Sequence, residues 1–175
     1  MKDELRKKLK IKRRYFTDIR RQEADRIICE EFMAAFSGYD SFFVYNSFGT
    51  EADTRLIIDG LLALGKKVYL PRVEGKDIVA VPYGECKKGA FGVDEPVGQP
   101  YTGEIEVAVV PLLAVNNHGF RIGYGGGYYD RFLKSSGAKR VGLGYYFQFE
   151  DFAPDDWDEK LDLYVCARGI YSFDD

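Results

Sequence analysis

Two stretches of apolar residues at helical spacing open the chain. Leu5 and Leu9 are four residues apart among basic side chains, which predicts a helix over residues 3–14. Thr17 is a suitable N-cap for a second helix, which we expect to run to about Phe36. The apolar stripe of that helix consists of Ile28, Phe32, Ala35 and Phe36. The chain is therefore expected to begin with a helical segment.

Short apolar runs follow, each of a length that suits a buried strand. A third helix, capped by Asp53 and ending at Gly65, separates the first run from the second. Residues 82–104 are rich in Gly and Pro and predict loops, and a last helix is expected over Tyr128–Lys134. The expected strands are residues 41–45, 67–71 with Pro71 as the end, 77–83, 105–110, 140–146 and 163–167.

Helices that alternate with short apolar strands are typical of a three-layer α/β/α fold with a largely parallel sheet. The chain has 175 residues, with no internal repeat and no linker of low complexity, so we expect a single domain over residues 1–175. Apolar residues make up 46% and charged residues 30%, which is the range of ordinary globular proteins and not of disordered ones.

Several classes of protein are disfavoured by simple features of the sequence. No apolar run approaches the roughly 20 residues that cross a bilayer, and the basic N-terminus has no apolar segment behind it, so neither a membrane partner nor a secretory signal is expected. Cys29, Cys86 and Cys166 form no CxxC pair, which favours a reducing, cytoplasmic setting. His118 is the single histidine, which excludes any site that needs two, and no general acid or base is assigned.

Charge is distributed unevenly although the net charge is only −3. Residues 1–26 contain 11 Lys and Arg against 5 Asp and Glu, whereas residues 150–175 contain 9 acidic residues against 2 basic ones. In one interpretation the basic segment binds the phosphate groups of a nucleotide or nucleic acid and the acidic segment holds a cation. In the other, both are solvated faces that attract each other.

The most informative segment is GFRIGYGGGYYDR, residues 119–131, in which Gly123, Gly125, Gly126 and Gly127 directly precede the last predicted helix. Glycines let a ligand approach the main chain, and successive free N–H groups form a cradle for phosphate. Arg121 and Arg131 would add positive charge, and Asp130 would hold Mg²⁺ beside the phosphate. The segment matches neither the Walker A pattern nor GxGxxG, because no Lys-Ser or Lys-Thr follows and position 128 is Tyr. The alternative is a tight turn packed on the sheet.

Two weaker features agree with phosphate chemistry. Lys2 and Arg6 are four residues apart on one helix face, where both side chains would grip a phosphate or simply be solvated. Glu51, in the segment TEADT, follows a predicted strand at the edge where α/β sheets bind ligands. An acidic residue near a helix N-terminus is the other interpretation of Glu51.

The run RIGYGGGYYDRFL resembles the signature of the 5-formyltetrahydrofolate cyclo-ligase family, also called methenyltetrahydrofolate synthetases. The rest of the chain follows the landmarks of that family in order: KDELR, YNSFGTEADT, GKKVYLPRVEGK, FGVDEP, VVPLLAV, GLGYYFQ and WDEKLD. The resemblance spans essentially the whole chain. It implies an ATP- and Mg²⁺-dependent ligase that converts 5-formyltetrahydrofolate to 5,10-methenyltetrahydrofolate, ADP and phosphate.

The same resemblance implies roles for individual residues. The pair Lys2 and Arg6 matches the N-terminal ATP-binding pair of the family, and Asp130 and Asp158 match positions associated with Mg²⁺. The matching ATP-binding loop comprises Arg121, Ile122, Gly123, Tyr124, Gly125, Gly126, Gly127, Tyr128 and Tyr129. The residues that match substrate-binding positions are Glu51, Asn46, Tyr129 and Phe91. The chain departs from the family at Trp157, where His is frequent, and at Asn116, where Asp is usual.

Two other functions are compatible with parts of the sequence. A different small-molecule enzyme on a related α/β scaffold, such as a sugar-phosphate isomerase or a CoA-transferase-like protein, would also use a phosphate cradle. A non-catalytic nucleotide or RNA binder would use the basic N-terminus, but the net negative charge and the confinement of the bases to one helix argue against it. We therefore expect 5-formyltetrahydrofolate and ATP as partners, no nucleic acid, and a monomer.

Overall fold

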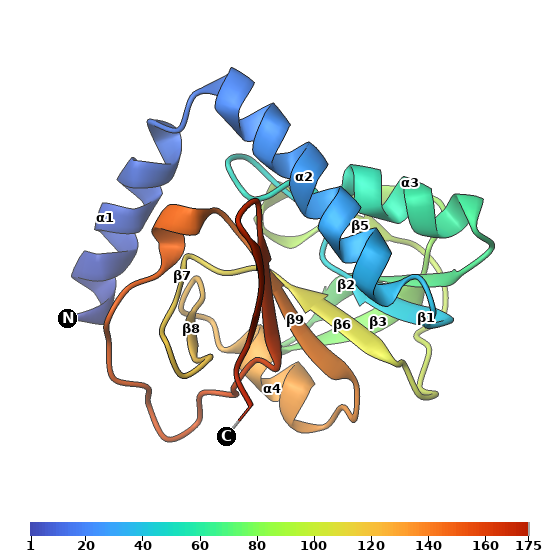
Figure 1. Cartoon of the computed structure of the whole chain (residues 1–175). Helices are drawn as coiled ribbons and strands as arrows, with labels where there is room; N and C mark the ends of the chain where they lie inside the picture. Colours follow the sequence, from blue (N-terminus) through green and yellow to red (C-terminus); the bar gives the residue numbers. More distant parts are fainter. Residues whose placement is uncertain (175) are drawn as a thin grey trace.

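Seven strands form one sheet at the centre of the computed structural model, which describes residues 1–174 (Figure 1). The strands are β1 (Ser41–Val44), β2 (Lys67–Glu74), β3 (Asp77–Pro82), β6 (Val107–Val110), β9 (Lys139–Leu143), β10 (Leu163–Cys166) and β11 (Gly169–Ser172). Their order across the sheet is β11-β10-β9-β6-β1-β2-β3. All neighbours from β10 to β2 are parallel, and only the two edge strands, β3 and β11, are antiparallel. The expected largely parallel sheet is confirmed.

Helices cover both faces of the sheet, as the pattern of buried residues requires. The helices are α1 (Lys2–Arg14), α2 (Asp18–Phe36), α3 (Arg55–Ala63) and α4 (Tyr128–Lys134). Phe42 and Val44 of β1 pack in the cluster formed with α2 and α3, whereas Phe43 between them packs in the cluster that contains α4. Successive side chains of a strand point to opposite faces, so this alternation places the helices in two outer layers. The three-layer arrangement follows (Figure 1).

The first helix belongs to neither layer. Leu9 of α1 packs against Leu113, Ala114 and Ile122, which form a small separate cluster. Ala114 and Ile122 belong to a short hairpin of β7 (Ala114–Val115) and β8 (Arg121–Ile122), which follows the carboxyl end of β6. Helix α1 therefore lies beside the carboxyl ends of the parallel strands, where α/β sheets bind ligands (Figure 1). None of the helices within residues 1–174 combines the length and apolar character of a membrane span.

The structure corrects the expected end of the second strand. Pro71 lies inside β2, which continues to Glu74. Pairing of β2 with β1 stops at Tyr69, and Pro71 faces Ala80 of β3 on the other side. The missing N–H of proline is therefore tolerated, because no inner strand needs it at that position.

The region expected to be loop contains a second, smaller sheet. Strands β4 (Cys86–Lys88) and β5 (Asp94–Pro96) pair in antiparallel fashion, and a 3-10 turn, η1 (Ala90–Gly92), joins them. We call residues 86–96 the flap. The helix cap also differs from the prediction: the N-cap of α3 is Thr54, and Asp53 instead accepts a hydrogen bond from the backbone N–H of Arg55.

Candidate active site

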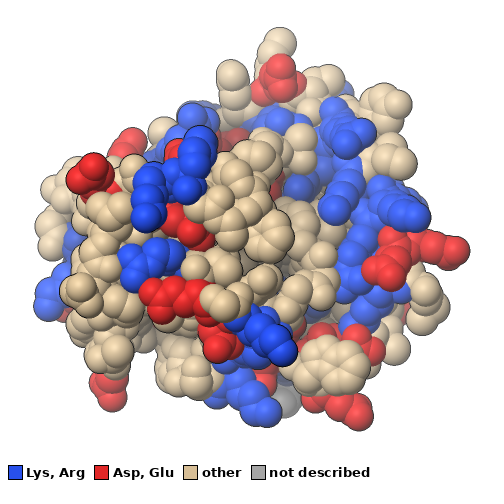
Figure 2. Space-filling view, turned by 180° about the vertical axis from the view of Figure 1, so that it is seen from behind, with Lys and Arg blue, Asp and Glu red and all other residues tan. Residues whose placement is uncertain are grey.

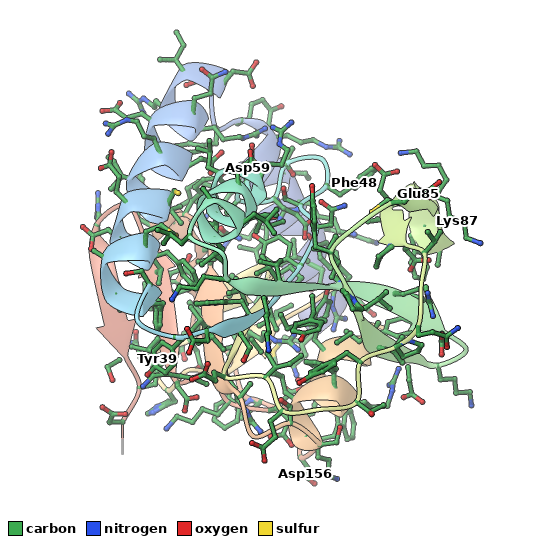
Figure 3. All side chains as sticks on the ribbon, turned by 90° about the vertical axis from the view of Figure 1, so that its right-hand side faces the viewer. Tyr39, Phe48, Asp59, Glu85, Lys87 and Asp156 are labelled. Carbon is green, nitrogen blue, oxygen red and sulfur yellow. The ribbon has the colours of Figure 1, made fainter. Side chains whose placement is uncertain are left out.

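A cavity of about 800 Å³ opens between α1, the loop after β1, the flap and the glycine-rich loop. Figure 2 shows the hollow from behind, with a row of Lys and Arg side chains along one side of it. Tyr39, before β1, and Phe48, after it, lie at opposite ends of the sheet (Figure 3), and only Phe48 lines the cavity. The cavity therefore occupies the carboxyl end of the sheet, as expected of an α/β ligand site.

Every residue that the family resemblance assigns to ATP, folate or Mg²⁺ lines this one cavity. They are Lys2, Arg6, Asn46, Glu51, Phe91, Arg121, Ile122, Gly123, Tyr124, Gly125, Gly126, Gly127, Tyr128, Tyr129, Asp130 and Asp158. They come from five separate parts of the chain, which the fold brings together. Their assignment to individual ligands stays a prediction. Arg131, which was expected to add charge to the phosphate cradle, is not among the described lining residues and donates to the carbonyls of Lys76 and Gly126.

The glycine-rich loop presents backbone to the cavity and is not packed on the sheet. Gly125 and Gly126 are exposed, and Gly125 and Gly127 have positive φ angles of 104° and 69°. A Cβ atom at Gly127 would also come 2.7 Å from Nη1 of Arg131. Arg6 Nε donates to the carbonyl of Gly123 at 3.0 Å, which ties α1 to the loop. Exposed backbone held in this way favours the phosphate cradle over the tight turn.

The basic and acidic segments meet at the start of α1. Lys2 Nζ lies 2.6 Å from Asp155 Oδ2 and 2.7 Å from Asp158 Oδ2. Burial alone would lower the pKa of Lys2, but the hydrogen bonds and charges of the two carboxylates outweigh it and raise that pKa. Lys2 is therefore a fixed positive charge at one end of the cavity. The two charged segments attract each other, and both also line the candidate site.

A buried arginine stands beside the predicted metal ligand. Arg121 is 5% exposed, and its Nη2 lies 3.3 Å from Asp130 Oδ1. Its Nε is buried and has no hydrogen-bond partner within residues 1–174. Burial lowers the pKa of Arg121, and the negative charge of Asp130 opposes that shift. Arg121 lines the cavity, and its Nε–H has no hydrogen-bond acceptor among the described residues.

Asp130 and Asp158 are brought together by the backbone. Asp130 Oδ1 accepts a hydrogen bond from the N–H of Glu159, the residue after Asp158. No group of three or more His, Cys, Asp or Glu side chains suited to a metal occurs in the described part of the chain. Mg²⁺ needs no such cage, since it is usually bound by one or two carboxylates together with water and substrate phosphates. The donor set of Asp130 and Asp158 fits Mg²⁺ when a phosphate completes it.

Glu51 lies at the other end of the cavity, on the loop between β1 and α3. Its Oε1 accepts from the N–H of Phe48 at 2.7 Å, and its Oε2 accepts from the hydroxyl of Tyr124 at 3.0 Å. Burial raises the pKa of Glu51, and the hydrogen bonds from Phe48 and Tyr124 and the charge of Arg13 partly offset the rise. The result is a half-buried carboxylate with defined orientation, suited to binding a ligand that donates hydrogen bonds.

The flap closes one side of the cavity at the end where Glu51 lies. Phe91 is 75% exposed, has a positive φ of 60°, and its ring centroid lies 6.1 Å from that of Tyr128. Asn46 Nδ2 donates to the carbonyl of Asp94 at 3.3 Å, which connects the loop after β1 to the flap. Phe91 therefore projects from the flap at the mouth of the cavity. Figure 3 shows Glu85, directly before the flap, and Lys87, within it, on the same side of the molecule as Phe48.

Several residues that line the cavity were not predicted from the sequence. They include Lys10, Arg13, Thr50, Glu95, Asp155 and Trp157. Arg13 stands out because it is buried, as is Leu9 four residues before it. Leu5, Leu9 and Arg13 share one helical face, so an arginine in line with an apolar stripe was the available signal. Asp155 carried no signal beyond its place in the acidic segment.

Comparison with known proteins relates the chain to one family. It matches the model of the 5-formyltetrahydrofolate cyclo-ligase family over residues 1–166. A 5-formyltetrahydrofolate cyclo-ligase from Mycoplasma genitalium is 40% identical over 76 residues, which is 42% of this chain and 46% of that protein. The alignment thus spans about half the length of that relative.

Two further matches cover more of the chain. A 5-formyltetrahydrofolate cyclo-ligase from Haemophilus influenzae is 32% identical over 132 residues, covering 67% of this chain and 71% of that protein. The solved structure of a 5,10-methenyltetrahydrofolate synthetase from Aquifex aeolicus superposes with a TM-score of 0.89 at 31% identity. That match covers 99% of this chain and 93% of the solved one, so the similarity includes every element that builds the cavity.

Proposed function

Because the chain belongs to the 5-formyltetrahydrofolate cyclo-ligase family, we propose that it converts 5-formyltetrahydrofolate to 5,10-methenyltetrahydrofolate with the conversion of ATP to ADP and phosphate. One observation carries the proposal. The residues that match the family's nucleotide, folate and metal positions come from distant parts of the sequence, and all of them line one cavity. Such convergence is expected of a site for two substrates that react with each other.

The chemistry of the reaction explains the need for ATP. A formamide carbonyl is a poor electrophile because its nitrogen donates electrons into it. When the formyl oxygen attacks the γ-phosphorus of ATP, ADP leaves and the oxygen becomes part of a good leaving group. N10 of the folate then attacks the formyl carbon and releases its proton to water, the ring closes, and the oxygen departs with the phosphate. The protein is left with two tasks, positioning and the stabilisation of charge.

The nucleotide end of the cavity is suited to the second task. Lys2, Arg6 and Arg121 place three cations around the exposed backbone of the glycine-rich loop. The unpartnered Nε of Arg121 would donate to a phosphate oxygen in a buried setting, where such a bond is strong. Asp130 and Asp158 would hold Mg²⁺, which neutralises phosphate charge when bound.

The folate end is suited to positioning. The carboxylate of Glu51 would accept hydrogen bonds from the polar edge of the reduced pterin, with Asn46 beside it and Phe91 over it. Burial raises the pKa of Tyr129 well above its ordinary value, so its hydroxyl stays protonated and is available as a donor. Tyr129 lines the cavity between the glycine-rich loop and Asp130, where the two substrates would meet.

The test of this proposal is a direct assay. Purified protein is mixed with 5-formyltetrahydrofolate, ATP and Mg²⁺, and the near-ultraviolet absorbance of methenyltetrahydrofolate is followed together with ADP release. We expect an absorbance rise that requires both ATP and Mg²⁺ and matches the ADP formed. Folded protein that binds ATP and forms no methenyl product would overturn the proposal and direct the search to another acceptor.

A further inference from the structure

Arg13 joins three segments that meet at the cavity. It is 5% exposed, although it lies on a strongly basic helix. Its Nε donates to Thr50 Oγ1 at 2.8 Å, its Nη1 donates to the carbonyl of Leu112 at 3.4 Å, and its Nη2 donates to the hydroxyl of Tyr124 at 2.9 Å. One guanidinium thus contacts the loop after β1, the chain after β6 and the glycine-rich loop.

Tyr124 extends this connection to the folate end. Its hydroxyl accepts from Arg13 and donates to Glu51 Oε2 at 3.0 Å. Burial and the nearby charge of Glu51 raise the pKa of Tyr124 well above its ordinary value, so the hydroxyl remains protonated and able to donate. We call Arg13, Tyr124 and Glu51 the bridge.

The bridge runs from the predicted nucleotide loop to the predicted folate carboxylate. We propose that Arg13 and Tyr124 are positioning residues that couple the two substrates: nucleotide on the glycine-rich loop fixes Tyr124, and Tyr124 fixes the carboxylate of Glu51 for folate. The identity of the two ligands rests on the proposed function. The coupling itself rests on the hydrogen bonds of the bridge.

The two ends of the bridge are constrained to different degrees. Tyr124 is 45% exposed and sits between Gly123 and Gly125, in a loop whose glycines permit many backbone conformations. Arg13 is buried and held from three sides. Tyr124, on the glycine-rich loop, is therefore the less constrained member of the bridge. A ligand that orders this loop reduces the cost of orienting Glu51, and the second ligand binds more tightly as a result.

Linkage makes the proposal testable without turnover. If nucleotide increases the affinity for folate by some factor, folate must increase the affinity for nucleotide by the same factor. A purely structural role of Arg13 and Tyr124 would change the binary affinities or the stability and leave this factor unchanged. The factor is thus the readout that separates coupling from support of the fold.

The experiment measures the dissociation constant of 5-formyltetrahydrofolate by calorimetry, with and without saturating adenylyl imidodiphosphate and Mg²⁺. For the wild-type protein we expect nucleotide to tighten folate binding by about 5- to 150-fold, the usual range of coupling between two sites. Tyr124→Phe keeps the ring and removes only the hydroxyl, and it should reduce the factor to about 1. Arg13→Lys keeps the charge and loses the fork that reaches three acceptors, so its factor should fall as well.

Tyr15→Phe is the matched control, because Tyr15 is 81% exposed just after α1 and is not among the described residues that line the cavity. It should keep the wild-type factor. A factor near 1 in the wild-type protein, or an unchanged factor in Tyr124→Phe, would overturn the coupling. Wild-type protein that forms the methenyl product but shows no coupling refutes the bridge alone, whereas protein that binds no 5-formyltetrahydrofolate refutes the proposed function and the bridge together.

Discussion

A single buried carboxyl group, that of Asp25, supports the loop that carries Glu51. Asp25 is 6% exposed, and its Oδ1 accepts from the hydroxyl of Tyr145 at 2.9 Å and from the N–H of Asp53 at 3.3 Å. Burial raises the pKa of Asp25, although these two hydrogen bonds oppose the shift. Asp25 therefore fixes the backbone two residues after Glu51 from the side of α2.

Replacing Asp25 should separate its role as an acceptor from its charge. Asp25→Ala leaves a buried hydroxyl and a buried N–H without an acceptor, so it should lower the free energy of unfolding by about 1–3 kcal/mol in urea denaturation at pH 7. Asp25→Asn keeps an acceptor and should cost less. Equal losses in the two variants would show that the hydrogen bonds contribute little.

The wild-type protein and Asp25→Asn should also differ in how their stability depends on pH. The folded-state pKa of Asp25 is raised above its ordinary 3.8, so in the window between these values the native state binds more protons than the unfolded state. The free energy of unfolding contributed by this group therefore falls as pH rises through that window. Stability curves should show this slope in the wild-type protein and a smaller one in Asp25→Asn. Identical slopes would contradict the raised pKa.

Asp130 is the residue on which the metal assignment depends. Asp130→Asn keeps an acceptor for Arg121 and for the N–H of Glu159 but removes the charge that Mg²⁺ requires. We expect turnover to fall by at least about tenfold and the half-saturating Mg²⁺ concentration to rise. The control is Asp156→Asn, because Asp156 is an exposed residue of the acidic segment (Figure 3). Wild-type kinetics in Asp130→Asn would make Asp130 a structural residue at the start of α4.

At the scale of elements, predictions succeeded where the sequence carries a local signal and failed where it carries none. Helices α1 and α2 have apolar residues at helical spacing, and the structure places both helices within one residue of the expected bounds. The flap carries no such pattern, because all three residues of β4 are exposed. It is fixed instead by a tertiary contact, in which Glu95 Oε2 accepts from the N–H of Val73 at 2.7 Å. No local rule predicts that contact.

This contact offers a way to move the flap without touching the glycine-rich loop. A Cβ atom at Gly89 would overlap the side chain of Glu95, so Gly89→Ala must displace that side chain and disturb its hydrogen bond with Val73, which holds the flap that carries Phe91. Because small displacements of positioning groups are costly, the KM for 5-formyltetrahydrofolate should rise by about tenfold or more while the KM for ATP changes little. Gly84→Ala, where the added atom meets only Pro82 O at 3.9 Å, should be silent. Equal changes in both KM values would show that the flap serves the whole cavity.

At the scale of the whole molecule, the fold class was accessible from the sequence and the full site was not. Alternation of helices and strands predicts a parallel sheet, and strand ends in such a sheet share one edge, which is why Glu51 and the glycine-rich loop could be expected to meet. Arg13 and Asp155 gain their places only through packing between distant segments. Lys2, for example, contacts Asp155 at a separation of 153 residues. Charge counts identify both segments but do not predict which side chains will touch.

The contact between the two ends of the chain leads to the last prediction. Lys2 and Arg6 both connect α1 to the predicted nucleotide end of the cavity. Lys2 does so through Asp155 and Asp158, and Arg6 does so through the carbonyl of Gly123. Removal of residues 1–6 should therefore raise the KM for ATP by about tenfold or more, since a hydrogen bond to a charged group contributes roughly 1.5–3 kcal/mol. The KM for folate should change less, because Arg13 and Leu9 still anchor the rest of α1.

Point variants separate the loss of charge from the loss of a helical turn. Lys2→Gln and Arg6→Gln should each raise the KM for ATP, and added salt should narrow the difference from the wild-type protein, because it screens partly exposed charges. Lys7→Gln is the matched control, since Lys7 is exposed on the same helix and lies outside the described lining of the cavity. If the truncation leaves the KM for ATP unchanged while the melting temperature falls, Lys2 and Arg6 hold the chain ends together and do not bind nucleotide. If the KM rises in both point variants at unchanged melting temperature, the basic start of the chain is part of the nucleotide site.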